Sequence, residues 1–236
     1  MKRAILMCAG SGTRWKNHLG TRKHLIRINN ERLIDRTVRM LRERSNSQIC
    51  IAAFDSSYDV PGTTRFAPSH GRENYLDTDK FLCSVDFWST DDQTLLVYGD
   101  VFFTAEAMNA VTSFTGACSF FGRPFPSRCT GRRWAELFAL SFSPSGGIKM
   151  REAMLDVRLQ LQNGQIKRGG GWEVYRRFNN LHPVCLVERR QPVGACFTTI
   201  DDFTDDFDHP EDYDEWIARY RVRRQQDRSL WRSSFK

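Results

Sequence analysis

The chain has 236 residues and a formal net charge of +7 at neutral pH. Hydrophobic residues at 40% and charged residues at 27% are ordinary proportions for a folded globular protein, and they exclude a largely disordered chain. No apolar run approaches the roughly 18 residues of a membrane span. The apolar stretch after the basic start breaks at Gly10, which argues against a secretory signal peptide. We therefore expect one globular domain without a membrane anchor.

Charge is distributed unevenly along the sequence. Residues 201–216 hold nine acidic residues and no Lys or Arg, whereas residues 217–236 hold seven basic residues and one acidic residue. The first 200 residues carry 28 basic residues against 18 acidic ones. A basic protein surface can bind phosphorylated small molecules as well as polynucleotides, so the net charge alone does not distinguish between these two kinds of partner.

The cysteines indicate the compartment. They are odd in number and never spaced Cys-x-x-Cys, at positions 8, 50, 83, 118, 129, 185 and 196. This pattern is typical of reduced thiols and does not suggest a disulfide framework or a zinc site. We therefore expect a cytoplasmic protein.

The first half of the chain alternates between predicted strands and predicted helices. Short apolar runs predict core strands at residues 4–9, 49–54, 94–98 and 117–121. Residues 24–28 alternate between apolar and polar side chains and predict a further strand. Apolar residues at helical spacing predict helices at residues 31–44, 77–88 and 104–114. The alternation indicates a three-layer α/β/α sandwich around a mainly parallel sheet.

The second half of the chain contains a longer predicted loop and a glycine-rich break. Residues 122–133 are rich in Gly, Pro and Arg and predict a long loop, and a glycine triplet at 169–171 breaks the chain again. The predicted elements here are strands at 135–142 and 193–200 and helices at 148–159 and 210–226. Without a repeat or a low-complexity linker, we expect a single domain over residues 1–236, with an embellished second half.

Two glycines follow the first predicted strand, in the segment Ala9-Gly10-Ser11-Gly12-Thr13-Arg14. Glycines at such a position let backbone N–H groups approach a phosphate or a base. Arg14 and the downstream Lys23 could neutralise a triphosphate. The segment lacks the Gly-Lys-Ser/Thr ending of a P-loop and the third glycine of the dinucleotide fingerprint, so those two kinds of nucleotide site are excluded.

Acidic residues follow two later elements. Asp100 comes directly after the predicted strand 94–98, at the edge of an open sheet where ligands bind, and an aspartate there can hold Mg²⁺ against a phosphate. Asp206 and Asp208 point to the same side if their segment is extended. Two neighbouring carboxylates repel one another unless a cation compensates, and a divalent metal would do so.

Together these segments resemble the nucleotidyltransferases, the pyrophosphorylase-type enzymes that activate sugar phosphates and choline phosphate with a nucleoside triphosphate. The family's opening Ala-Gly-x-Gly-Thr-Arg corresponds to residues 9–14, its following Lys to Lys23, and its strand-end Gly-Asp to Gly99-Asp100. Its closing acidic segment resembles residues 206–213. His24 and His209 stand where Pro and Thr are usual, which leaves the subfamily open. The resemblance implies a Rossmann-like, glycosyltransferase-A-like nucleotidyltransferase fold.

The resemblance also implies a mechanism. Residues Ala9, Gly10, Ser11, Gly12, Thr13 and Arg14 would bind the nucleotide. Lys23 would lie between the α-phosphate and the acceptor, and Arg14, Lys23 and Asp100 would be the catalytic residues. Mg²⁺ would be held by Asp100 and Asp206, with Asp208 as a further ligand. The acceptor's anionic oxygen would attack the α-phosphorus and pyrophosphate would leave, without a general base.

The acceptor site is expected in the second half of the chain. Residues 1–121 would then form a nucleotide-binding half, 122–200 an acceptor-binding half, and 201–236 a metal-binding segment with a basic tail. Glu136, Trp172 and Glu173, together with Lys23, are the candidate acceptor contacts, and loop arginines at 123, 128, 132 and 133 could attract an anionic acceptor. A sugar 1-phosphate and a choline-phosphate-like acceptor are equally compatible with the residues.

Two other functions compete with this hypothesis. A glycosyltransferase of related fold would carry a second carboxylate two residues after Asp100, where the sequence has Phe102. A nucleic-acid-binding module could use the arginines at 219–224, but on a helix they fall on several faces and no RNA-binding motif accompanies them. We therefore expect a nucleoside triphosphate and a small phosphorylated acceptor as partners, and neither a membrane nor nucleic acid.

Overall fold

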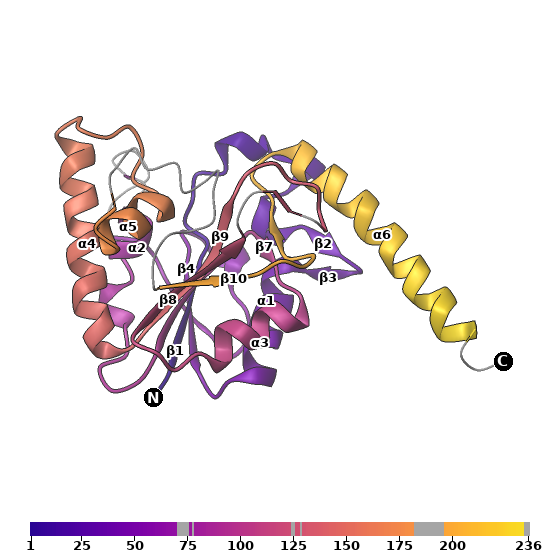
Figure 1. Ribbon diagram of the computed structural model, residues 1–236, viewed down its shortest axis with the longest axis horizontal. Helices are drawn as coiled ribbons and strands as arrows, with labels where there is room; N and C mark the ends of the chain where they lie inside the picture. Colours follow the sequence, from indigo (N-terminus) through magenta and orange to yellow (C-terminus); the bar gives the residue numbers. More distant parts are fainter. Residues whose placement is uncertain (70–75, 77, 124–125, 128, 182–195, 234–236) are drawn as a thin grey trace.

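A seven-stranded sheet forms the centre of the molecule (Figure 1). The computed structural model describes residues 1–69, 76, 78–123, 126–127, 129–181 and 196–233. The strand order is β10-β8-β9-β6-β1-β4-β5. Its strands are β1 (Arg3–Met7), β4 (Gln48–Ala52), β5 (Thr64–Phe66), β6 (Thr94–Tyr98), β8 (Cys118–Arg123), β9 (Glu136–Phe142) and β10 (Phe197–Thr199). All run in one direction except β9, which pairs antiparallel with both β6 and β8. The predicted mainly parallel sheet is confirmed.

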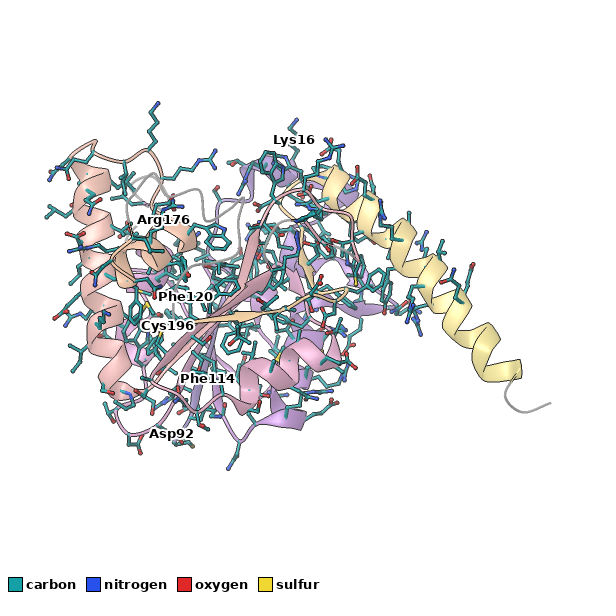
Figure 2. The ribbon with its side chains drawn as sticks, viewed as in Figure 1. Lys16, Asp92, Phe114, Phe120, Arg176 and Cys196 are labelled. Carbon is teal, nitrogen blue, oxygen red and sulfur yellow. The ribbon has the colours of Figure 1, made fainter. Side chains whose placement is uncertain are left out.

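Helices cover both faces of this sheet, as the three-layer prediction requires. Alternate residues of β1 point to opposite faces: Ala4 and Leu6 pack with α1 (Leu33–Arg44) and α3 (Ala105–Ser113). Ile5 and Met7 pack with α2 (Asp79–Leu82), α4 (Pro144–Gln162) and α5 (Gly171–Phe178). Phe120 of β8 lies under α5, where its ring meets that of Tyr175 at 5.1 Å between centroids (Figure 2). β1 is therefore buried on both sides, which accounts for its uninterrupted apolar sequence.

A smaller third cluster lies at the carboxyl edge of the sheet. Two antiparallel two-stranded ribbons contribute to it. One pairs β2 (Arg27–Ile28) with β3 (Glu31–Arg32), and the other pairs β7 (Val101–Phe102) with β11 (Asp205–Asp206). The first turns of α6 (Pro210–Ser233) complete it through Trp216, which packs on Phe102 and Phe207. Short 3₁₀ turns are η1 (Thr13–Trp15), η2 (His18–Gly20), η3 (Lys23–Leu25), η4 (Ser56–Tyr58) and η6 (Val85–Phe87). None of the helices in the described part of the chain is long and apolar enough to cross a membrane.

Several predicted elements differ from the observed ones. The strand expected at 24–28 is wrong in its first half, because Lys23–Leu25 turn as η3 and β2 begins only at Arg27. The single helix expected at 77–88 is broken into α2 and η6. α4 begins earlier than expected, because Ser143 caps the Gly146 amide and Pro144 occupies the first turn. The expected start at 77, the first residues of 193–200 and position 128 lie outside the described residues.

Candidate functional site

The glycine loop leaves the middle of the sheet at the end of β1. Gly12 has a φ of +64°, in the left-handed region that favours glycine, and this turn starts η1. Arg14 projects from η1 with 59% of its side chain exposed, and its Nη2 lies 2.7 Å from Oδ2 of Asp208. The motif that opens the sequence is thereby joined to the acidic segment near its end.

Lys23 occupies the centre of the candidate site. Its Nζ donates a hydrogen bond to Oδ1 of Asp208 at 2.8 Å and forms an ion pair with Asp100. Burial alone would lower the pKa of Lys23, but the two carboxylates outweigh burial and raise it. Burial likewise opposes ionisation of Asp100, yet Lys23 lowers the pKa of that carboxyl to about 2. The ammonium of Lys23 therefore lies between the carboxyl groups of Asp100 and Asp208, and the pKa shifts of Lys23 and Asp100 both favour the charged form.

A short ribbon brings the acidic segment to this place. β11 pairs antiparallel with β7, so Asp206 lies opposite Val101, and the Phe207 amide donates to the Asp100 carbonyl at 3.2 Å. Asp205 forms a fully buried ion pair with Arg123, whose Nη2 is 2.7 Å from its Oδ1. This pair anchors the segment, and Arg123 is thereby unavailable to an acceptor.

Asp206 and Glu136 have carboxyl groups whose charged forms are disfavoured by their surroundings. Asp206 is 7% exposed, and its Oδ1 is buried without a hydrogen-bond partner. Burial, followed by the neighbouring carboxylates of Glu136 and Asp208, raises the pKa of Asp206 well above its usual range. Burial also raises the pKa of Glu136 to about 8, against the opposing effect of Arg123. Such a cluster is unfavourable in the free protein and would be relieved by a cation.

The donor chemistry fits a divalent cation of the Mg²⁺ type. Within the described ranges, no three His, Cys, Asp or Glu side chains converge into a complete protein metal site. Mg²⁺ commonly takes only one or two carboxylates and completes its coordination with substrate phosphates and water. The orphaned oxygen of Asp206, with the carboxyl groups of Asp100 and Asp208 that line the same cavity, could supply such a partial set.

Two adjoining cavities flank the glycine loop and share Gly10, Ser11, Gly12, Lys23 and His24 as lining. The larger, of about 310 Å³, extends toward β6, β9 and α5 and contains all four acidic site residues. Its remaining wall includes Tyr98, Leu137, Gly171 and Trp172. The smaller, of about 210 Å³, extends toward the end of β4 and is lined by Trp15, Asn17, Arg22, Phe54 and Tyr58. The loop thus separates two lobes of one cleft.

The structure places the remaining predicted residues as follows. Glu136 and Trp172 line the larger lobe, and their role as acceptor contacts stays a prediction. Glu173 is not part of that lining. Its Oε1 accepts a hydrogen bond from Nη2 of Arg176 at 2.7 Å, and both residues line a separate cavity beside α4. Arg132 is bound to Asp212 and mostly buried. Glu173 and Arg132 are thus held in ion pairs with other protein residues, and an acceptor contact by Glu173 stays a prediction.

Most residues that line the smaller lobe were not predicted from the sequence. His24 is 3% exposed, and its Nδ1 lies 3.1 Å from Oη of Tyr58. Burial lowers the pKa of His24 to about 4, so the ring is neutral at physiological pH. The guanidinium of Arg22 in turn lies 5.7 Å from the Tyr58 ring centroid. The sequence offered one signal, namely that His24 stands where the family usually has Pro, but nothing in the sequence linked His24 to Tyr58.

No protein-family model matches the sequence, and no curated protein is significantly similar to it. Solved structures do match. A Bacillus anthracis protein assigned as a glucose-1-phosphate thymidylyltransferase has a TM-score of 0.58 at 11% identity, over 92% of this chain and 94% of its own. CTP:phosphocholine cytidylyltransferase from Streptococcus pneumoniae has a TM-score of 0.58 at 14% identity, over 91% and 96%. A nucleotidyl transferase from Methanothermobacter thermautotrophicus has a TM-score of 0.50 at 14% identity, over 70% and 83%.

At these identities the likeness concerns the fold, and it extends over nearly the whole length of the first two structures. It agrees with the order and placement of the three motifs around one cleft. The chain is an α/β protein with the nucleotidyltransferase fold, and the resemblance inferred from its motifs is confirmed at that level.

Proposed function

We propose that this protein is a nucleotidyltransferase that transfers a nucleoside monophosphate from a triphosphate to a small phosphorylated acceptor and releases pyrophosphate. One observation carries the proposal. Arg14, Lys23, Asp100 and Asp208, up to 194 positions apart, meet in consecutive ion pairs beside a glycine loop that lines a cleft. Cations beside a carboxylate pair and free backbone amides are the components that in-line attack at phosphorus requires.

The two lobes suggest how the substrates divide the cleft. The phosphates would lie over the glycine loop, with the exposed Arg14 on the β- and γ-phosphates. The base would enter the smaller lobe between Trp15 and Tyr58. The acceptor would occupy the larger lobe, against Glu136 and Trp172, as either a sugar 1-phosphate or a choline-phosphate-like compound.

The chemical step follows from the charges. An anionic phosphate oxygen of the acceptor attacks the α-phosphorus, the bond from that phosphorus to the bridging oxygen breaks, and pyrophosphate departs. Lys23 would exchange its carboxylate partners for phosphate oxygens and hold the attacking and attacked groups together. Mg²⁺ bound by Asp100 and Asp206 would supply charge neutralisation at the α-phosphate. No proton has to be removed from the attacking oxygen.

We also propose that the protein works in the cytoplasm, where nucleoside triphosphates are available. The six cysteines in the described part of the chain form no disulfide bonds, which suits a reducing compartment.

The proposal is tested by a pyrophosphate-release screen of the four common nucleoside triphosphates and thymidine triphosphate against a panel of phosphorylated acceptors. At least one pair should give Mg²⁺-dependent release. Asp100→Asn should abolish it, and Arg14→Ala should lower it about 100-fold or more, as removal of a transition-state charge partner does. Asp86→Asn and Arg151→Ala, at exposed positions outside the cleft, serve as controls. Release that survives Asp100→Asn would contradict the proposal.

A further inference from the structure

A separate cavity lies beside α4, outside both lobes of the cleft. Its volume is about 380 Å³, and its lining comes from the end of α4, the loop that follows, α5 and Leu181. None of these lining residues lines the cleft. α5 packs against α4 (Figure 1) and borders the cleft as well, because Gly171 and Trp172 at its start line the larger lobe. Cavities of this size are in the range that small molecules occupy in proteins.

Basic side chains dominate the lining of this cavity. One lining residue, Glu173, is acidic, and four are basic, namely Lys167, Arg168, Arg176 and Arg177. Two of the four are held within the protein, because Arg176, whose side chain is 8% exposed, binds Glu173, and Arg177 binds Asp156. The exposed side chains of Lys167 and Arg168 form no ion pair or hydrogen bond with any residue that the structure describes. The cavity therefore offers two cations that no described acidic residue neutralises.

Another part of the lining is apolar. Val157 is 2% exposed and belongs to the core cluster between the sheet and the helices α4 and α5. Ile166 and Leu181 are partly buried and pack against the same cluster, and all three residues line the cavity. An inorganic ion would leave these side chains facing water, whereas a molecule with an apolar body would cover them. The lining thus matches a ligand that has both an anionic group and an apolar body.

The two neighbouring cations favour a doubly charged anion. A phosphate monoester carries a charge of about −1.5 to −2 at neutral pH and three strong acceptor oxygens, whereas a carboxylate carries a single charge. The guanidinium of Arg168 presents a fork of donors that matches two phosphate oxygens, and Lys167 adds a compact charge. A polynucleotide fits less well, because it is bound by basic side chains spread along an extended groove, and here they border one cavity.

We propose that this cavity is a binding site for a small phosphate monoester with an apolar body. Lys167 and Arg168 hold the phosphate, and Val157, Ile166 and Leu181 contact the apolar body. The site goes beyond the proposed nucleotidyl transfer and does not depend on it. Binding can therefore be measured without any turnover.

Calorimetry with phenyl phosphate tests the site on the full-length protein in the presence of a chelator. Phenyl phosphate should bind at least about 10-fold more tightly than inorganic phosphate, because its ring covers the apolar part of the lining. Lys167→Glu with Arg168→Glu should weaken the binding of phenyl phosphate at least about 10-fold. Arg151→Glu with Arg221→Glu changes the net charge equally at exposed positions outside both the cavity and the cleft, and it should leave binding unchanged.

A second measurement separates this cavity from the cleft, which is itself proposed to bind phosphates. Phenyl phosphate should slow hydrogen exchange in residues 157–178, in the wild type and in Arg14→Ala alike. Circular dichroism identifies a charge-reversal variant that fails to fold, and Lys167→Gln with Arg168→Gln then gives the same comparison.

Three results would each overturn the proposal. The first is a protein that does not bind phenyl phosphate at millimolar concentration, and the second is an equal affinity for inorganic phosphate. The third is binding that survives the substitution of Lys167 and Arg168 but is lost in Arg14→Ala, with slowed exchange confined to residues 9–25, which would place the ligand in the cleft.

Discussion

Replacing Lys23 by Met removes the ammonium around which the candidate site is organised. Methionine has nearly the same length as the lysine stem, so the change deletes the charge and leaves the packing largely intact. In the protein as it stands, that charge is shared by Asp100 and Asp208. The substitution leaves both carboxylates close together without their common counter-ion.

The size of the effect follows from burial. Removing one partner of a buried ion pair costs about 3–5 kcal/mol, because the other charge is left uncompensated. The side chains of Lys23, Asp100 and Asp208 are 10%, 17% and 22% exposed, which favours the lower end of that range. At about 3 kcal/mol, a domain of this size should melt about 6–12 °C lower.

Thermal unfolding with a chelator and then with Mg²⁺ measures this loss and its cause. With chelator, Lys23→Met should melt well below the wild type, whereas Lys16→Met, at an exposed lysine in the same loop region (Figure 2), should not. Mg²⁺ should restore several degrees to Lys23→Met, because a divalent cation can then take the place of the ammonium, and should change the wild type much less. Equal melting temperatures in chelator, or a variant indifferent to Mg²⁺, would refute this reasoning.

Three further substitutions probe the cleft. Asp206→Asn should raise the free energy of unfolding by about 1–3 kcal/mol at neutral pH in chelator, and it should abolish Mg²⁺-dependent activity. Because the pKa of Asp206 is raised in the fold, this gain in stability should vanish at a pH low enough to protonate the carboxyl in both the folded and the unfolded protein. His24→Gln should make the stability of the protein less sensitive to acid. The lowered pKa of His24 contributes stability that is present above pH 6.5 and is lost as the pH falls toward about 4. In urea titrations over that interval, the free energy of unfolding should therefore fall by about 3 kcal/mol more in the wild type than in the variant. Gly171→Ala should destabilise the fold and raise the KM for the acceptor, because its Cβ would come within 2.2 Å of Oη of Tyr98. Gly170→Ala is the control, since its Cβ meets no atom nearer than 3.5 Å. Adding Tyr98→Phe should reverse much of the stability loss of Gly171→Ala, and a double variant no more stable than the single one would contradict this explanation.

The sheet could be predicted from sequence because its strands are buried on both faces. β1, β4 and β6 read as short apolar runs for that reason, and their order along the chain with intervening helices indicates the parallel arrangement. α5 was not predicted because the glycine triplet at 169–171 is typical of a chain break, whereas Gly170 is the N-cap of the helix and Gly171 its first residue. β11 escaped as well, since a two-residue strand has no periodicity to detect.

The candidate site was partly predictable for a related reason. The glycine loop and Asp100 follow neighbouring parallel strands, so sequence order alone places them at the same edge of the sheet. The exact partners were not predictable: Asp208 binds both Arg14 and Lys23 only because β11 pairs with β7. Tertiary pairing of this kind leaves no local trace in the sequence.

The position of an isotopic label in the triphosphate tests the central claim most directly. With an active pair of substrates, label at the α-phosphorus should appear in a nucleoside diphosphate linked to the acceptor, and label at the γ-phosphorus should appear in pyrophosphate. Both transfers should disappear in Asp100→Asn. Label moving from the γ-position to the acceptor, or an α-label recovered only in free nucleotide, would show a different reaction and contradict the assignment of this cleft to nucleotidyl transfer.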